Sequence, residues 1–124
     1  MISPAIEELQ HDRTVFGWDV LQDGKVTERL EPKSLAPYHA RVGYFPGAII
    51  RTSALQEYKS VLHKYLSVLQ LSVDFSMLLW NSGKQVHVDP KMVYQIDNID
   101  RRQRKGAPIK PNTNTLQIWK RESI

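Results

Sequence analysis

Asp74 is the acidic residue best placed for chemistry. It lies within the apolar run 71–75, at the expected start of a helix, where free backbone N–H groups and the helix dipole favour a carboxylate. At the edge of a cleft, such a carboxylate can accept a proton from a hydroxyl group. It can equally be a first-turn residue that only stabilises its helix, and the residues alone leave both interpretations open.

A second candidate site is the segment 44–48, Tyr-Phe-Pro-Gly-Ala, which lies between a polar loop and an apolar strand. Gly47 permits close approach of the backbone to a ligand, and the aromatic side chains offer a face on which a sugar or a base can stack. The same residues are also typical of a purely structural turn.

The third group is basic and begins at Arg101. The chain has a net charge of +4, and residues 101–124 hold seven basic residues against one acidic residue. Phosphates of nucleic acid, of lipid headgroups or of a nucleotide diphosphate would suit the cluster Arg101, Arg102, Arg104 and Lys105. No aromatic residues alternate with it, so a stacking platform for single strands is not supported. A solvated loop is the alternative interpretation.

Composition excludes several other classes of site. The 124 residues are 41% hydrophobic and 24% charged, as in one globular domain or a part of one. The absence of cysteine excludes disulfides, thiolate metal sites and cysteine nucleophiles. The four histidines lack the spacing of a zinc site, and no phosphate-binding loop, dinucleotide fingerprint or nucleophile elbow is present.

Hydrophobic periodicity predicts the elements that must position these residues. The best signal is a helix over 53–69, with apolar residues three and four apart after a Ser53/Gln56 capping box. A second, buried helix is predicted from Ser72 or Asp74 to Trp80, stopped by Gly83. The remaining expectations are a helix over 4–10, strands over 14–21, 26–30, 48–51, 85–88, 92–96 and 116–119, an Asp-Gly turn over 22–25, and a loop over 31–46.

The order of these pieces resembles the C-terminal, acceptor-side half of family 2 glycosyltransferases of the GT-A fold, over residues 4–98. The run from Pro46 to Leu55 matches that family's Pro-Gly-x-x-x-Arg-x-x-x-Leu segment, and 72–79 is similar to the helix that carries its general base. Residues 83–94 look like the strands that follow. Val73 stands where the family has glutamate, 95–97 replace its Arg-x-His, and the nucleotide-binding half with Asp-x-Asp is missing.

The resemblance implies an α/β fold, a partial GT-A-like mixed sheet with two main helices, over residues 1–98, followed by a basic tail over 99–124. It implies inverting transfer of a sugar from a nucleotide sugar to a hydroxyl acceptor, with Asp74 as general base. Acceptor binding would fall to Pro46, Gly47 and Arg51, and metal binding to Asp97. Phosphate binding by Arg101, Arg102, Arg104 and Lys105 is expected from their charge, since they lie beyond the resemblance.

The same resemblance implies Mn²⁺ or Mg²⁺ in the complete enzyme, with none expected in this chain alone, to screen the leaving diphosphate. Expected partners are the missing N-terminal half or a second copy of the chain. The expected location is the cytoplasm, with peripheral contact to an anionic membrane. The alternative function is a small non-enzymatic binding or assembly domain whose basic tail docks on an anionic partner.

Overall fold

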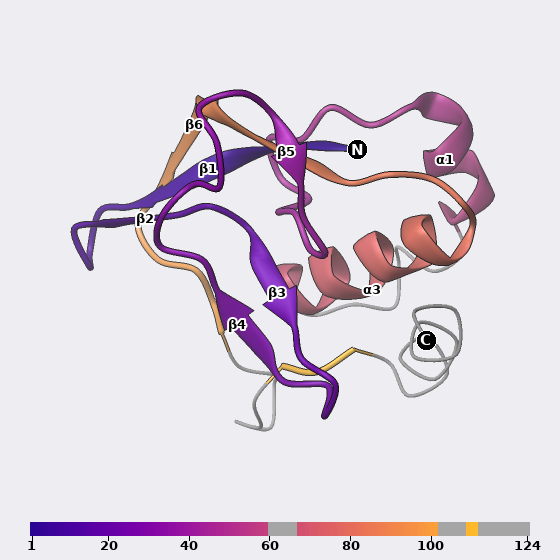
Figure 1. Cartoon of the computed structure of the whole chain (residues 1–124), viewed down its shortest axis with the longest axis horizontal. Helices are drawn as coiled ribbons and strands as arrows, with labels where there is room; N and C mark the ends of the chain where they lie inside the picture. Colours follow the sequence, from indigo (N-terminus) through magenta and orange to yellow (C-terminus); the bar gives the residue numbers. More distant parts are fainter. Residues whose placement is uncertain (60–66, 102–108, 112–124) are drawn as a thin grey trace.

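The computed structural model describes residues 1–59, 67–101 and 109–111. A curled, mixed four-stranded sheet has the order β2-β1-β6-β5, and β3 and β4 form a separate two-stranded ribbon (Figure 1). The elements in chain order are β1 (Ile2–Glu8), β2 (Arg13–Val15), β3 (Trp18–Val20), β4 (Val26–Glu28), β5 (Tyr38–His39), α1 (Thr52–Glu57), α3 (Val68–Asn81) and β6 (His87–Ile96). The α/β class, the mixed sheet and the two helices are as predicted.

Strand β1 replaces the helix predicted over 4–10, and that prediction was wrong. Residues 3–6 are all buried. β1 lies between β2 and β6, pairing in parallel with β6, and its faces are packed, with Ile6 in the core of Val73 and Ser3 against the segment 43–45. A strand with both faces covered is apolar without alternation, so its sequence lacks the period-two signal. Pro4 is tolerated since β2 pairs only with residues 6–8, which leaves the N-terminal part of that edge outside the ladder.

Strand β6 runs through Asp89 and Pro90, where the sequence predicted a break between two strands. The register with β1 shifts there, so that Pro4 lies opposite Asp89 but Ala5 lies opposite Val93. The extra residues form a bulge, in which the Asp89 carboxylate accepts the N–H of Lys91 at 3.0 Å. The proline therefore bends the strand without ending it.

Four further features differ from prediction. Gly17, at φ +82°, separates β2 from β3 where one strand was expected over 14–21. Helix α3 begins at Val68 and not at Ser72 or Asp74, with Ser67 as its cap. Residues 48–51 form only an isolated bridge, between Ile49 and Ile2. Helix α1 ends at Glu57, and the rest of the helix predicted over 53–69 falls partly on 60–66, outside the described residues.

The expected Asp-Gly turn is confirmed, with Gly24 at φ +88°, and so is Gly83 as the left-handed stop of α3. The strand predicted over 116–119 lies outside the described residues.

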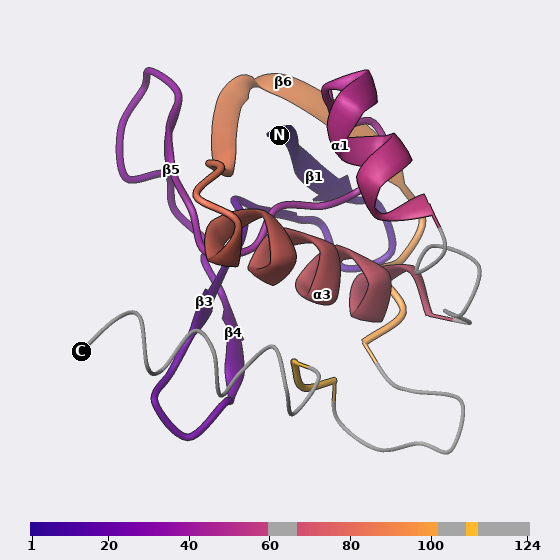
Figure 2. The same cartoon turned by 90° about the vertical axis from the view of Figure 1, so that its right-hand side faces the viewer.

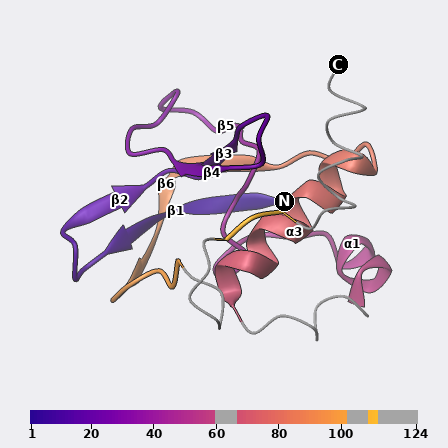
Figure 3. The same cartoon turned by 90° about the horizontal axis from the view of Figure 1, so that it is seen from below.

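Helix α3 is buried on two sides, as its apolar sequence predicted. Leu69, Val73 and Met77 pack with Trp18 of β3 in one core. Phe75 and Leu79 pack with Ala54 of α1 in a second core. Figure 3 shows α1 and the β3–β4 ribbon on opposite sides of α3.

The segment 43–45 passes between β1 and α3, and three buried serine hydroxyls satisfy its backbone. Each hydroxyl accepts one N–H, in the pairs Ser76–Gly43 (3.1 Å), Ser3–Tyr44 (2.8 Å) and Ser72–Phe45 (2.9 Å). A Cβ on Gly43 would lie 2.6 Å from the Cβ of Ser3. This approach positions the Pro46–Arg51 segment that follows.

We expect Gly43→Ala to lower the free energy of unfolding by about 3 kcal/mol, because β1 and α3 must separate to admit the methyl group. Urea denaturation measures the effect. Gly83→Ala is the matched control, since its Cβ would meet nothing within 4 Å and only its left-handed backbone costs about 1 kcal/mol. Equal losses in the two variants would contradict the close packing at Gly43.

Candidate functional site

The predicted site residues lie in three places: the amino end of the β1–β6 pair, its carboxyl end, and helix α3. Arg51 lies at the amino end of the β1–β6 pair, where Ile49 bridges to Ile2. Asp97 and Arg101 follow the carboxyl end of β6. The seven residues of β1 separate these two ends by about 20 Å, so Arg51 does not share one small pocket with Asp97 or Arg101.

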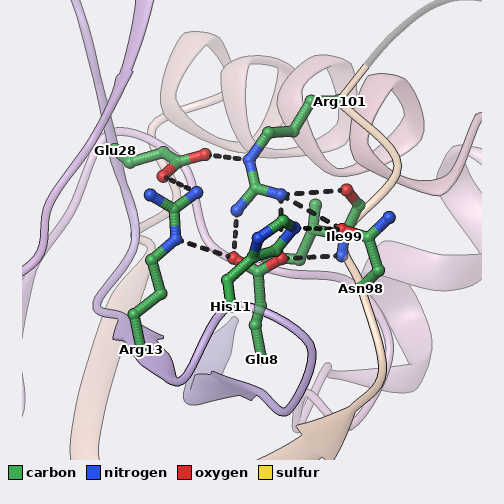
Figure 4. Close-up of polar contacts among 7 residues, drawn as sticks. All are labelled: Glu8, His11, Arg13, Glu28, Asn98, Ile99 and Arg101. Atoms are coloured by element: carbon green, nitrogen blue, oxygen red, sulfur yellow. Dashed lines mark hydrogen bonds and ion pairs between the residues drawn. The ribbon is translucent and has the colours of Figure 1, made fainter.

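An ion-pair network of Glu8, Arg13, Glu28 and Arg101 occupies the carboxyl end (Figure 4). The Glu8 side chain is fully buried. It accepts the backbone N–H of Ile99 at 3.0 Å, Nη1 of Arg101 at 2.8 Å and Nε of Arg13 at 3.3 Å. Glu28 joins the network from β4, accepting Nη2 of Arg13 at 3.1 Å and Nε of Arg101.

The network keeps Glu8 and Arg101 ionised. Burial alone would raise the pKa of Glu8, but hydrogen bonds from Arg101, Ile99 and Arg13, with the charge of Arg101, outweigh burial and lower that pKa to about 2. Burial would lower the pKa of Arg101, yet its bonds to Glu8 and Glu28 raise it above the ordinary arginine value. Both side chains are therefore charged at neutral pH.

Arg101 is thus paired with two carboxylates. A contact of Arg101 with a phosphate would compete with both pairs, so the guanidinium has a structural role at this end of the sheet. The other residues of the predicted phosphate-binding cluster, Arg102, Arg104 and Lys105, lie outside the described residues.

Asp74 lies in the interior of α3, not at the helix mouth where the sequence placed it. Only 3% of the residue is exposed. Its carboxylate accepts Nε2 of Gln70 at 2.9 Å, and the same Nε2 donates to the carbonyl oxygen of Lys110 at 2.7 Å. Figure 2 shows the segment 109–111 beside α3, and Ile109 packs in the same core as Leu69. A hydroxyl group can reach Asp74 from this side only if 109–111 moves.

Arg51 lines a cavity of about 490 Å³ at the amino end of the sheet, named here the amino-end cavity. Lys84 and His87, from the chain after α3 and the start of β6, line it with Ser53 of α1. Pro46 and Gly47 do not line it. Gly47 instead turns the chain at φ +77°, and a Cβ there would lie 3.0 Å from the ring of Tyr94.

No sequence pattern predicted Lys84 and His87 as partners of Arg51. The His87 ring lies 4.4 Å from that of His39, centroid to centroid. Burial, the His39 ring and the chain amino group lower the pKa of His87. Only the pairing of β1 with β6 brings these groups to the cavity.

Asp97 is exposed after β6, and its carbonyl oxygen accepts the N–H of Gln10 at 3.0 Å. Among the described residues, no group of three or more histidine or acidic side chains is arranged to hold a metal ion. Mg²⁺ and Mn²⁺ need several oxygen ligands, so Asp97 alone does not fit such an ion, and no chemical step is assigned to a metal. Neither described helix combines the length and the apolar character that a bilayer crossing requires.

Comparison with known proteins gives no relative: no family model, curated protein or solved structure matches the chain.

We expect Glu8→Gln to lower the free energy of unfolding at pH 7 by about 3 kcal/mol, because Arg13 and Arg101 would lose a buried counter-charge. Urea denaturation measures the loss. Glu7→Gln is the control. The Glu7 carboxylate meets only the amide of Gln95 at 3.3 Å among the described partners, so the change should stay within about 0.5 kcal/mol.

The pH dependence supplies a second test. The folded-state pKa of Glu8, about 2, lies below its ordinary value of 4.5, so its contribution is complete above pH 4.5 and is lost as the pH falls toward 2. The stability difference between wild type and Glu8→Gln should therefore shrink from pH 5 to pH 3. A constant difference over that interval would contradict the assignment.

Proposed function

We propose that this chain is the acceptor-side part of an inverting glycosyltransferase, which moves a sugar from a nucleotide-sugar donor to a hydroxyl acceptor. The observation that carries the proposal is the position of Arg51. The segment that resembles the family's Pro-Gly-x-x-x-Arg motif ends at an arginine that lines the amino-end cavity. Ser53 lines the same cavity and offers a hydroxyl to an acceptor.

In this proposal Pro46 and Gly47 do not contact the acceptor, because they do not line the amino-end cavity. They turn the chain against Tyr94 and Pro4 and thereby direct Arg51 and α1 toward the cavity. The serine bonds to residues 43–45 hold the start of the same segment. Acceptor binding would thus depend on a backbone fixed between β1 and α3.

Asp74 remains the proposed general base, with a condition that its surroundings impose. Gln70 and the carbonyl of Lys110 lie next to it, so proton abstraction requires the segment 109–111 to move away from α3. Movement of a covering segment is a common way for an enzyme to admit substrate and exclude water.

We expect Asp74→Asn to lower kcat for sugar transfer by about 10²–10⁴-fold, the usual contribution of a general base. The assay uses the full-length enzyme of this proposal, in which the nucleotide-binding half precedes this chain. The control is Asp23→Asn, in the β3–β4 turn, where an asparagine oxygen can still accept the N–H of Lys25. A kcat within about threefold of wild type would exclude Asp74 as the base.

The alternative, a non-enzymatic assembly domain, is favoured by the outer edge of β6. β5 pairs only with His87 and Val88, and no other described strand covers this edge. Val93 is 56% exposed and Tyr94 is 38% exposed. Pro90 and Lys91 protect the first part of the edge from pairing, so a partner strand would add at 93–96.

If the chain assembles through this edge, Val93→Lys should convert a dimer into a monomer, because an edge lysine opposes strand addition. Sedimentation velocity over a wide concentration range measures the change. Val68→Lys is the matched control, since Val68 is 43% exposed at the start of α3 and away from the edge. A wild-type chain that is monomeric throughout would exclude the assembly alternative.

A further inference from the structure

The amino-end cavity combines a basic rim with an apolar wall. Arg51, Lys84 and His87 line it, and Ile2 and Ile50 contribute apolar surface. No aspartate or glutamate is among the described residues that line it. Two cationic side chains, Arg51 before α1 and Lys84 after α3, favour an oxyanion, which each of them can contact by a charge-assisted hydrogen bond.

The cations of this rim are only weakly compensated. Lys84 Nζ contacts Glu57 at 3.0 Å, but both side chains are more than a third exposed, and exposed pairs of this kind contribute little. Within the described parts of the chain, the Arg51 guanidinium has no ion pair. The arginines of the carboxyl end, in contrast, are both paired with buried or half-buried carboxylates.

The size of the cavity exceeds that of a bare anion. About 490 Å³ is within the range of small-molecule sites, so space remains beside Ile2 and Ile50 for an organic group. From the charge, the size and the apolar wall, we propose that the amino-end cavity binds a phosphorylated small molecule. Its phosphate lies between Arg51 and Lys84, its organic part lies on the apolar wall, and His87 donates a further hydrogen bond.

The binding itself stands whether or not the chain transfers sugar. The proposed general base, Asp74, does not line this cavity, so the bound phosphate compound is not assigned as the hydroxyl acceptor.

The experiment titrates the full 124-residue chain at pH 7 with inorganic phosphate and with glycerol phosphate, followed by amide chemical shifts. We expect saturable shifts at Ser53, Lys84 and His87, with dissociation constants on the order of 1 mM, and tighter binding of glycerol phosphate than of inorganic phosphate. Arg51→Gln should weaken both by about tenfold or more, since a charge-assisted bond contributes more than about 1.4 kcal/mol.

Arg29→Gln is the matched control, because it removes the same charge from the Asp19 pair and should leave both affinities within about twofold. Equal binding by wild type and Arg51→Gln, or shifts that map elsewhere on the chain, would overturn the proposal. Thermal unfolding of Arg51→Gln checks that the exposed substitution leaves the fold intact. If the full-length enzyme binds phosphate but does not transfer sugar, the proposed function is excluded and this inference stands.

Discussion

The fully buried carboxylate of Glu8 is the constraint on which the arrangement of strands depends. Removing a carboxylate from water costs several kcal/mol unless cations and hydrogen-bond donors replace the water. Here the replacements come from two segments: Arg13 at the start of β2, close to Glu8 in the sequence, and Ile99 and Arg101 after β6, at the far end of the described sheet. Because Glu28 of β4 shares both arginines, one buried charge fixes the sheet, the β3–β4 ribbon and the chain after β6 together.

The buried Glu8 charge also makes the two ends of the β1–β6 pair different in how their cations are paired. At the carboxyl end Arg13 and Arg101 are both paired with Glu8 and Glu28, so these four charges serve the fold. At the amino end Arg51 has no ion pair among the described residues, and Lys84 has only an exposed one. Capacity to bind an anion therefore lies at the amino end, where the polar groups are not already committed to each other.

Pattern-based prediction succeeded for elements that are determined locally. The Asp-Gly turn, the glycine after α3 and the buried character of α3 follow from backbone conformation and composition within a few residues. Prediction failed for β1, where Ile6 and Leu9 suggested a helix face. Residues 3–6 are buried on both faces, so they show no period-two alternation, and the partner strand β6 lies more than eighty residues away in the sequence.

The sequence by itself determined the residue types that are available: an arginine after a Pro-Gly segment, an aspartate in an apolar helix and a basic tail. Tertiary structure decided which of them meet. It placed Asp74 in the middle of a helix beside Gln70, bound Arg101 to two carboxylates, and brought Lys84 and His87 to Arg51. The physical reason is that charge compensation and cavity shape depend on neighbours in space, which strand order and register set and which spacing along the chain does not record.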